Sequence, residues 1–341
     1  MNFAGLQAGA ALPAYAEAQK GAAGAEEGEE GLFGGTRGAA GKERKTVYLI
    51  PCGTPFGVRF YTDGALIRRV NEGSAAESAG LAAGDLIVGV NGEKVGSIPE
   101  FFASLEKSGG EVRISYVRTG AQEEATLRKP EKGGEEALGL RLRDMMAGIG
   151  TLTYYDPETG LFAGLGHGIC RDGTAELLPL GRGSITDVRI TSVKKGERGS
   201  PGQLRGLFCP GERGVLKKNE AQGVFGVMTG APPEGEALPA ARFEEVRAGK
   251  AEILCTVGSE GRARYKVEIE KIFGDGGDGK NYLLRVTDER LLEAAGGIVQ
   301  GMSGSPILQN GRIVGAVTHV LVEDPAKGYG IYIGNMLEKQ G

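Results

Sequence analysis

Residues 301–318 have the sequence Gly-Met-Ser-Gly-Ser-Pro-Ile-Leu-Gln-Asn-Gly-Arg-Ile-Val-Gly-Ala-Val-Thr, and they constrain the architecture more than any other segment. Apolar residues flank Asn310-Gly311, a dipeptide suited to a type I′ turn, so the pattern predicts a strand, a tight hairpin and a second strand. Just before the hairpin, Ser303 stands between two glycines. Such glycines allow a sharp turn and leave main-chain N–H groups free to face a developing oxyanion.

The segment resembles, without a gap, the nucleophile hairpin of trypsin-like serine proteases, whose pattern is Gly-Asp-Ser-Gly-Gly-Pro, a strand, Asn-Gly and a strand. The resemblance implies that Ser303 is the nucleophile and that the N–H groups of Gly301 and Ser303 form the oxyanion hole. An ordinary Gly/Ser-rich turn, or Ser305 as the nucleophile, are the alternatives. Met302 stands where the trypsin pattern has aspartate, so the ion pair that activates those zymogens cannot form here.

Length and composition favour a mainly β protein of two domains plus tails. The chain has 341 residues, which suggests two domains. Its 61 glycines, the absence of tryptophan and a hydrophobic share of 40% are typical of a protein rich in strands and turns. The net charge of −4 is mild, so we expect neither nucleic acid nor a polybasic membrane surface among its partners.

The spacing of cysteine and histidine argues against a metal site. No Cys-x-x-Cys or His-x-x-x-His motif occurs, so we expect no metal and no cofactor. Cysteine pairing stays open between three disulfide arrangements and free thiols, for Cys52, Cys170, Cys209 and Cys255.

The N-terminal residues 1–44 are rich in Gly, Ala and Glu without periodicity, and their composition predicts a disordered tail. Ala14-Tyr15-Ala16 is similar to a signal-peptidase site, but a basic region before it is missing and the apolar stretch is weak. A remnant of an export signal and a plain disordered tail are both open. No run of 18 apolar residues occurs, so the sequence shows no clear membrane anchor.

Residues 45–130 resemble a PDZ domain of the kind attached to bacterial proteases. The resemblance rests on Phe56-Gly57-Val58, on residues 64–70, and on residues 73–92, which run from Gly-Ser-Ala-Ala to Asn-Gly. Ser97 and Glu100 form a capping box that predicts a helix through about Lys107. The resemblance implies that Phe56, Gly57 and Val58 form a loop whose N–H groups hold a peptide carboxylate, with the peptide added as a strand beside the helix. A purely structural or self-occupied groove is the alternative.

Residues 131–341 change to strand patterns and contain both histidines. His167 lies between glycines at the end of a predicted hairpin, and histidine suits the general base that a serine nucleophile needs. In the trypsin-like register, Thr318 and His319 lie on the strand that pairs with substrate, so we expect them to line a subsite. The orienting acid is open among several aspartates. Asp288 precedes a short predicted helix and also suits its N-cap.

His167 in Gly-Leu-Gly-His-Gly-Ile, Asp288 in Val-Thr-Asp, Ser303 in its glycine-rich motif and the ending Gly-Ala-Val-Thr-His-Val together resemble the SpoIVB family of sporulation signalling peptidases. The resemblance covers about residues 46–337. It implies a Ser303–His167–Asp288 triad. It also implies secretion from the forespore into the space between the two spore membranes, and cleavage of a membrane-bound regulator that leads to activation of a late sigma factor. The missing anchor is where this chain departs from the pattern.

These observations predict a PDZ domain at 45–130 followed by a chymotrypsin-like antiparallel β-barrel serine peptidase domain at 131–341, with a tail at 1–44. The predicted activity is that of a serine endopeptidase. Its partners would be a membrane-anchored regulatory protein as substrate and a peptide in the PDZ groove, which its own N-terminal segment could supply. The alternatives are a catalytically silent PDZ scaffold that binds peptide tails, and a protein that cuts only itself.

Overall fold

The computed structural model describes residues 7–8, 46–130, 134–172, 174–258, 260–276 and 279–341. Nearly all of the predicted tail at 1–44 lies outside these residues. The exception is β1 (Gln7–Ala8), which pairs with β11 (Gln203–Phe208). The described chain forms two β-barrels and a smaller α+β part, so the prediction of a mainly β fold with a PDZ domain and a chymotrypsin-like peptidase domain is confirmed.

The first barrel is a ring of antiparallel strands that closes because β10 pairs with β3 as well as with β12. Its interior is filled by large apolar side chains that alternate along the strands, among them Phe56, Phe60 and Phe162. In ring order the strands are β3 (Pro55–Val70), β8 (Leu140–Tyr155), β9 (Leu161–Gly164), β13 (Gly223–Met228), β12 (Gly214–Glu220) and β10 (Leu180–Lys194).

The second barrel closes independently and carries the hairpin that contains Asn310-Gly311. Both residues have positive φ, 51° and 73°, as the predicted type I′ turn requires. Helix α4 (Glu289–Ala295) follows one of its strands, and α5 (Ile333–Gln340) ends the chain. In ring order the strands are β15 (Gly249–Thr256), β16 (Arg262–Ile272), β17 (Tyr282–Val286), β20 (Asp324–Tyr332), β19 (Arg312–Leu321) and β18 (Pro306–Gln309).

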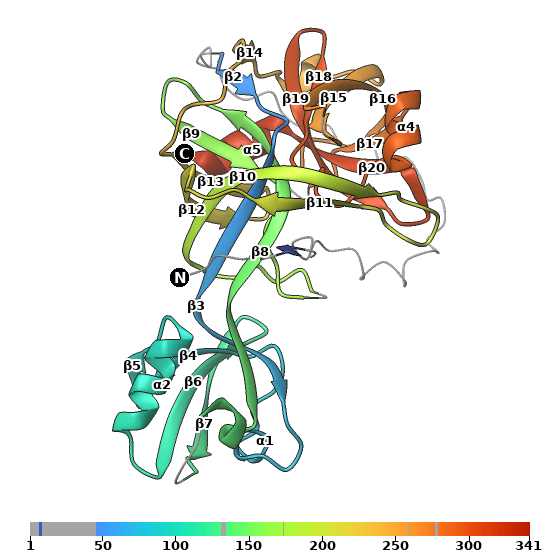
Figure 1. Cartoon of the computed structure of the whole chain (residues 1–341). Helices are drawn as coiled ribbons and strands as arrows, with labels where there is room; N and C mark the ends of the chain where they lie inside the picture. Colours follow the sequence, from blue (N-terminus) through green and yellow to red (C-terminus); the bar gives the residue numbers. More distant parts are fainter. Residues whose placement is uncertain (1–6, 9–45, 131–133, 173, 259, 277–278) are drawn as a thin grey trace, which may run out of the picture.

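Two long strands, β3 and β8, connect the PDZ part to the first barrel and belong to both (Figure 1). Helix α2 begins after the Ser97 cap and ends at Lys107, as the capping box predicts. Its buried face packs on a separate apolar core that includes Ile87, Phe101 and Ile114. The elements are α1 (Ala75–Ser78), β4 (Leu86–Val90), β5 (Glu93–Lys94), α2 (Ile98–Lys107), β6 (Glu111–Arg118), β7 (Ala121–Arg128) and α3 (Glu135–Leu138).

The prediction that Phe56, Gly57 and Val58 form a carboxylate-binding loop is wrong. These residues lie inside β3, with β8 paired along one edge and β10 along the other, so their N–H groups face neighbouring strands rather than a peptide. Phe56 and Val58 point into the first barrel and are buried. A short apolar run has the same pattern in a loop and in a buried strand, which is why periodicity could not separate them. Residues 46–62 therefore pack with the barrels rather than with the PDZ part.

Two short strands lie outside the barrel rings: β2 (Tyr48–Pro51) pairs with β8 and with β14 (Leu238–Pro239). All of the cysteines lie in the described part of the chain and are free thiols, which answers the question that the spacing left open. Burial raises the pKa of the Cys52 thiol to about 12, so this cysteine is inert rather than nucleophilic.

Candidate active site

Ser303 lies in the tight turn that leads into β18 of the second barrel, beside the first barrel. Its Oγ donates a hydrogen bond to the Thr318 carbonyl at 2.7 Å. Ser305 is fully buried, and its Oγ donates to the Met302 carbonyl at 2.6 Å. A substrate cannot reach Ser305 in this arrangement, which leaves Ser303 as the serine that fits the nucleophile role. Met302, in the place of the trypsin aspartate, is buried in the core of the second barrel.

The turn presents two main-chain donors. Every carbonyl from Gln300 to Ser303 accepts a hydrogen bond. The Gln300 carbonyl accepts from Leu204 N at 2.8 Å, and the Gly301 and Ser303 carbonyls accept from Thr151. The Met302 carbonyl accepts from Ser305 N and Ser305 Oγ of the same turn. Because a trans peptide points its N–H away from its carbonyl, these bonds turn the N–H groups of Gly301 and Ser303 outward. Within the described residues, neither N–H has a hydrogen-bond acceptor, as an oxyanion hole requires.

Glycine at position 304 is needed for this turn. Gly304 has φ of +97°, a region that residues with a side chain rarely adopt. A Cβ built on it would lie 2.0 Å from the Thr151 carbonyl oxygen and 2.5 Å from Leu165 N. The glycine therefore lets the second barrel approach β8 of the first barrel closely enough for backbone contact.

His167 follows β9 after a tight bend. Leu165 has φ of +68°, which is strained for a residue with a side chain, and Gly166 has the same φ. His167 is 7% exposed, and its Nδ1 lies 2.9 Å from the Gly168 carbonyl oxygen. Burial lowers the pKa of His167 below its ordinary value, and the hydrogen bond to Gly168 opposes that shift. His167 is therefore neutral near pH 7, as a general base must be.

Thr318 and His319 lie beside both groups. The rings of His167 and His319 pack at a centroid distance of 5.1 Å with 33° between their planes. Thr318 is fully buried, and its Oγ1 donates to the Gly279 carbonyl at 3.0 Å. Burial, with smaller contributions from the charges of His167 and Lys280, lowers the pKa of His319 to about 3, so its ring stays neutral near pH 7. The His319 ring thus packs on His167 as a neutral group, and its Nδ1 is buried without a hydrogen-bond partner among the described residues.

Asp288 is the N-cap of α4, as its sequence context allowed. Its Oδ1 accepts from Arg290 N and Nε, and its Oδ2 accepts from Lys266 N and Arg290 Nη2. Hydrogen bonding from Arg290, with a smaller contribution from the Lys266 and Arg290 backbone N–H groups, lowers the pKa of Asp288 to about 2 against the opposing effect of burial.

The structure thus brings Ser303, Thr318, His319 and His167 together through a chain of contacts. It does not bring Asp288 into that chain: in the described part of the molecule, the Asp288 carboxylate has no hydrogen bond to His167. Catalytic hydrogen bonds are often absent from ligand-free enzymes, so the roles of the predicted triad stay predictions.

The described residues contain no group of three or more His, Cys, Asp or Glu side chains that could hold a metal ion. No helix among them is both long enough and apolar enough to cross a membrane.

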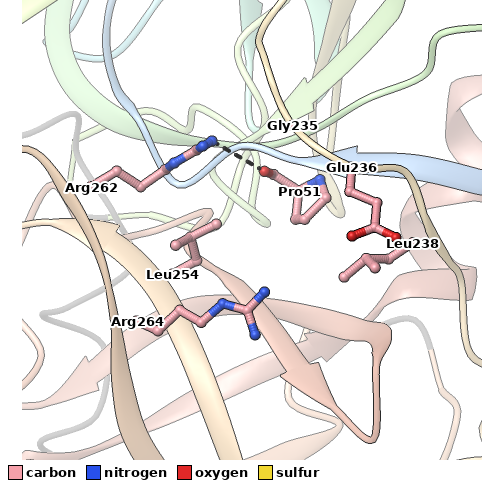
Figure 2. A pocket seen from close by; sticks show the side chains of 7 residues that line it. All are labelled: Pro51, Gly235, Glu236, Leu238, Leu254, Arg262 and Arg264. Atoms are coloured by element: carbon pink, nitrogen blue, oxygen red, sulfur yellow. Dashed lines mark hydrogen bonds between the residues drawn. The ribbon is translucent and has the colours of Figure 1, made fainter.

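Two cavities lie away from Ser303. The smaller, of about 140 Å³, lies between β2 and the second barrel, where Arg262 binds the carbonyl of Pro51 (Figure 2). The larger, of about 460 Å³, lies at the N-terminus of α2, where the PDZ part meets the first barrel, and β8 contributes Asp144 to it. Its lining is mostly polar and charged: Tyr61, Thr62, Asp63, Lys94, Gly96, Ser97, Glu100, Asp144, Gly181 and Arg182.

Comparisons with known proteins agree with this architecture. The model of a family described as SpoIVB peptidase S55 matches residues 134–337, and that of the PDZ domain matches residues 66–118. A periplasmic serine protease of Haemophilus influenzae, described as do/HhoA-like, is 37% identical over 67 residues, which are 19% of this chain and 14% of that protein. The chain thus spans a small part of the length of this curated relative.

Solved structures that match this chain include the Rv3671c protease in its inactive form, at 15% identity and a TM-score of 0.31. That match covers 57% of this chain and 84% of the other. The active form of the Rv3671c protease from M. tuberculosis matches at 14% identity and a TM-score of 0.32, over 57% of this chain and 73% of the other.

Proposed function

The chain belongs to the SpoIVB peptidase S55 family and is a serine peptidase, and on that premise we propose that it is an endopeptidase whose nucleophile is Ser303 and whose general base is His167. The observation that carries the proposal is the pair of unbonded N–H groups on Gly301 and Ser303, beside the Ser303 hydroxyl. They are placed to accept the negative charge that develops on a scissile carbonyl oxygen, which is the largest electrostatic need of acyl transfer.

The proposed reaction has two steps. His167 takes the Ser303 hydroxyl proton as Oγ bonds to the carbonyl carbon, and the C–N bond breaks as the amine leaves with that proton. Water then attacks the acyl-enzyme with His167 again as base, which frees the acid and restores the serine. The Ser303 hydroxyl must first turn from the Thr318 carbonyl toward His167, because that carbonyl now takes its hydrogen bond.

Asp288 remains the proposed orienting acid, but it can take this role only if its carboxylate is released from its present partners. In this conformation the Gly168 carbonyl holds Nδ1 of His167, while Arg290 and Lys266 saturate the Asp288 carboxylate. For Asp288 to orient the base, the cap of α4 must open as the site forms. The Arg290 side chain is 66% exposed, so its guanidinium can return to water, whereas the Asp288 side chain is 6% exposed and would need the His167 imidazole to replace the donors that it loses.

The PDZ part would present a peptide along β8 rather than along residues 56–58. Over residues 140–146, β8 pairs with β3 on one edge, and no other described strand pairs with it there. At the opposite edge, Leu142 N donates to the Glu135 carboxylate at 2.6 Å, a bond that an added peptide would replace. The Asp144 side chain of β8 accepts from Ile98 N at 2.9 Å and so ties the strand to α2. An edge strand beside a helix is the arrangement to which a peptide adds as a further strand.

The substrate we propose is a membrane-bound regulatory protein, cleaved to trigger late sigma-factor activation in sporulation, with the exported, intermembrane compartment of the forespore as its setting. This rests on the family resemblance. The Gly-rich residues 17–44 are a proposed self-cleavage target. An N-terminus that stays intact after long incubation of active protein would count against self-cleavage.

Labelling with a fluorophosphonate probe tests the proposed site. Wild type should label, and Ser303→Ala and His167→Ala should not, because an unactivated or missing hydroxyl cannot bond to phosphorus. Ser305→Ala is the matched control on the neighbouring buried serine, and its labelling should survive. Labelling that persists in Ser303→Ala would refute the site. A wild type that does not label would favour the catalytically silent scaffold.

A further inference from the structure

Thr151 lies where the two barrels touch. It belongs to β8 of the first barrel, is 2% exposed, and faces the turn of the second barrel that carries Ser303. The sequence gives no sign of this position, because a threonine in an apolar strand is ordinary β structure.

Thr151 bonds to both halves of the proposed site. Its N–H donates to the Ser303 carbonyl at 2.9 Å, and its Oγ1 donates to the Gly301 carbonyl at 2.8 Å. Its own carbonyl accepts from Leu165 N at 3.2 Å, two residues before His167. One residue therefore fixes the nucleophile turn and anchors the strained bend that carries the proposed base.

The carbonyls that Thr151 binds belong to Gly301 and Ser303, the same two residues whose N–H groups form the proposed oxyanion hole. The Gly301 carbonyl shares its peptide plane with Met302 N, and the Ser303 carbonyl shares its plane with Gly304 N. Thr151 therefore holds the two peptides on either side of the Met302–Ser303 peptide, which carries the Ser303 N–H. Gly301 depends on this most, because it has φ of +99° and no side chain to limit its backbone. Without the Oγ1 bond, the Gly301 carbonyl would be a buried acceptor without its donor, and the Gly301–Met302 peptide would be held only by the bond from Met302 N to the Val299 carbonyl at 3.0 Å.

We propose that Thr151 is a positioning residue of the oxyanion hole, and that its hydroxyl keeps Gly301 in the conformation that aims the donors at the transition state. This inference rests on the proposed function of the Ser303 site. It goes beyond it by giving a first-barrel side chain a part in catalysis without contact with the substrate. Donors must lie about 2.7–3.1 Å from the oxyanion, so a small rotation of the turn is costly.

The test is the rate of fluorophosphonate labelling at saturating and limiting probe, which separates the limiting rate from the apparent affinity. Thr151→Val removes the hydroxyl and keeps the shape, and we expect its limiting rate to fall about 10- to 100-fold with affinity nearly unchanged. Thr151→Ser restores the hydroxyl and should recover most of the rate. Thr151→Ala serves the same purpose should the valine variant not fold.

Thr153→Val is the matched control. Thr153 is buried two residues along the same strand, and its hydroxyl has no hydrogen-bond partner among the described residues. Its loss should leave the labelling rate unchanged, since it holds no part of the turn. Thermal unfolding of each variant separates a lost fold from a misaimed donor.

The outcomes distinguish this inference from the proposed function. A silent Ser303→Ala together with Thr151→Val that labels at the wild-type rate would overturn the inference alone. The same holds if Thr151→Ser is as slow as Thr151→Val at equal thermal stability. Labelling that survives Ser303→Ala, or a wild type that fails to label, would overturn the proposed function and the inference with it.

Discussion

The turn that carries Ser303 and the segment that carries His167 differ in how completely hydrogen bonds fix them. In the turn, every carbonyl from Gln300 to Ser303 has a donor, and both N–H groups of the proposed oxyanion hole face outward. The His167 ring has only a hydrogen bond to its neighbour Gly168 and a stack against His319. Ser303 itself donates to Thr318 rather than to His167.

In the proposed site, therefore, the oxyanion hole is already formed, whereas the contact between Ser303 and His167 that proton transfer requires must still form. If the proposed roles hold, movement of the segment that carries His167 would decide whether the site is active, without disturbing the turn. This segment continues to Asp172, which pairs with Arg68 of the PDZ part. Both side chains are about half exposed, so the pair is weak and easily exchanged.

The largest change in labelling rate is expected for Asp288→Asn, which tests how the His167 segment assembles. Asparagine caps a helix as well as aspartate, so the variant removes the charge and keeps α4. If Asp288 orients His167 in the assembled site, as we propose, the labelling rate falls about 10⁴-fold. The lost ion pair with Arg290 should also lower the melting temperature, so the rates are compared at a temperature at which both proteins are folded. Arg290→Gln, which frees the Asp288 carboxylate, should not slow labelling. A rate for Asp288→Asn within threefold or so of wild type would leave the Gly168 carbonyl as the orienting group.

A smaller fall in labelling rate is expected when the turn that carries Ser303 is distorted. Gly304→Ala places a Cβ against the Thr151 carbonyl, a backbone atom that cannot swing aside, so the turn must shift. We expect the labelling rate to fall about 100-fold and the melting temperature to drop. Gly311→Ala is the control, because φ there is also positive, at +73°, but the space around it is open. Equal rates for the two variants would mean that the turn tolerates displacement.

The smallest expected effect is the dependence of the labelling rate on pH, which depends on the protonation of His167. Burial lowers the pKa of His167, so its neutral form persists at more acidic pH than that of a free histidine, whose pKa is about 6.5. The labelling rate should therefore stay near its maximum at pH 6.5 and decline only below it. Rates measured from pH 4 to 8 in buffers of constant ionic strength check this. A decline centred above pH 6.5 would mean that the active base is not buried as His167 is here.

The local elements of the fold could be predicted because their signals lie within a few residues. The capping box of Ser97 and Glu100 predicted α2, and Asn310-Gly311 predicted the hairpin between β18 and β19. The position of Asp288 before a short helical pattern predicted the N-cap of α4. Phe56 was misplaced because its short apolar segment gives no sign that β10 would cover its second edge. That pairing joins residues far apart in the chain.

The same limit applies to the site. Ser303 and its glycines form one short motif, so the nucleophile turn could be proposed from sequence. The His167–His319 stack and the Thr151 bonds join segments about 150 residues apart, and only folding brings them together. No periodicity or spacing could have named Thr151.

The most direct test of the central claim is a crystal structure of the protein with a peptide boronate, which mimics the tetrahedral intermediate. The account predicts a covalent bond from boron to Ser303 Oγ, with one boronate oxygen about 2.7–3.1 Å from both the Gly301 and the Ser303 nitrogen. It also predicts that the turn keeps its bonds to Thr151 while His167 moves to meet the adduct. A boronate bound to another residue, or one whose oxygens point away from these nitrogens, would contradict it.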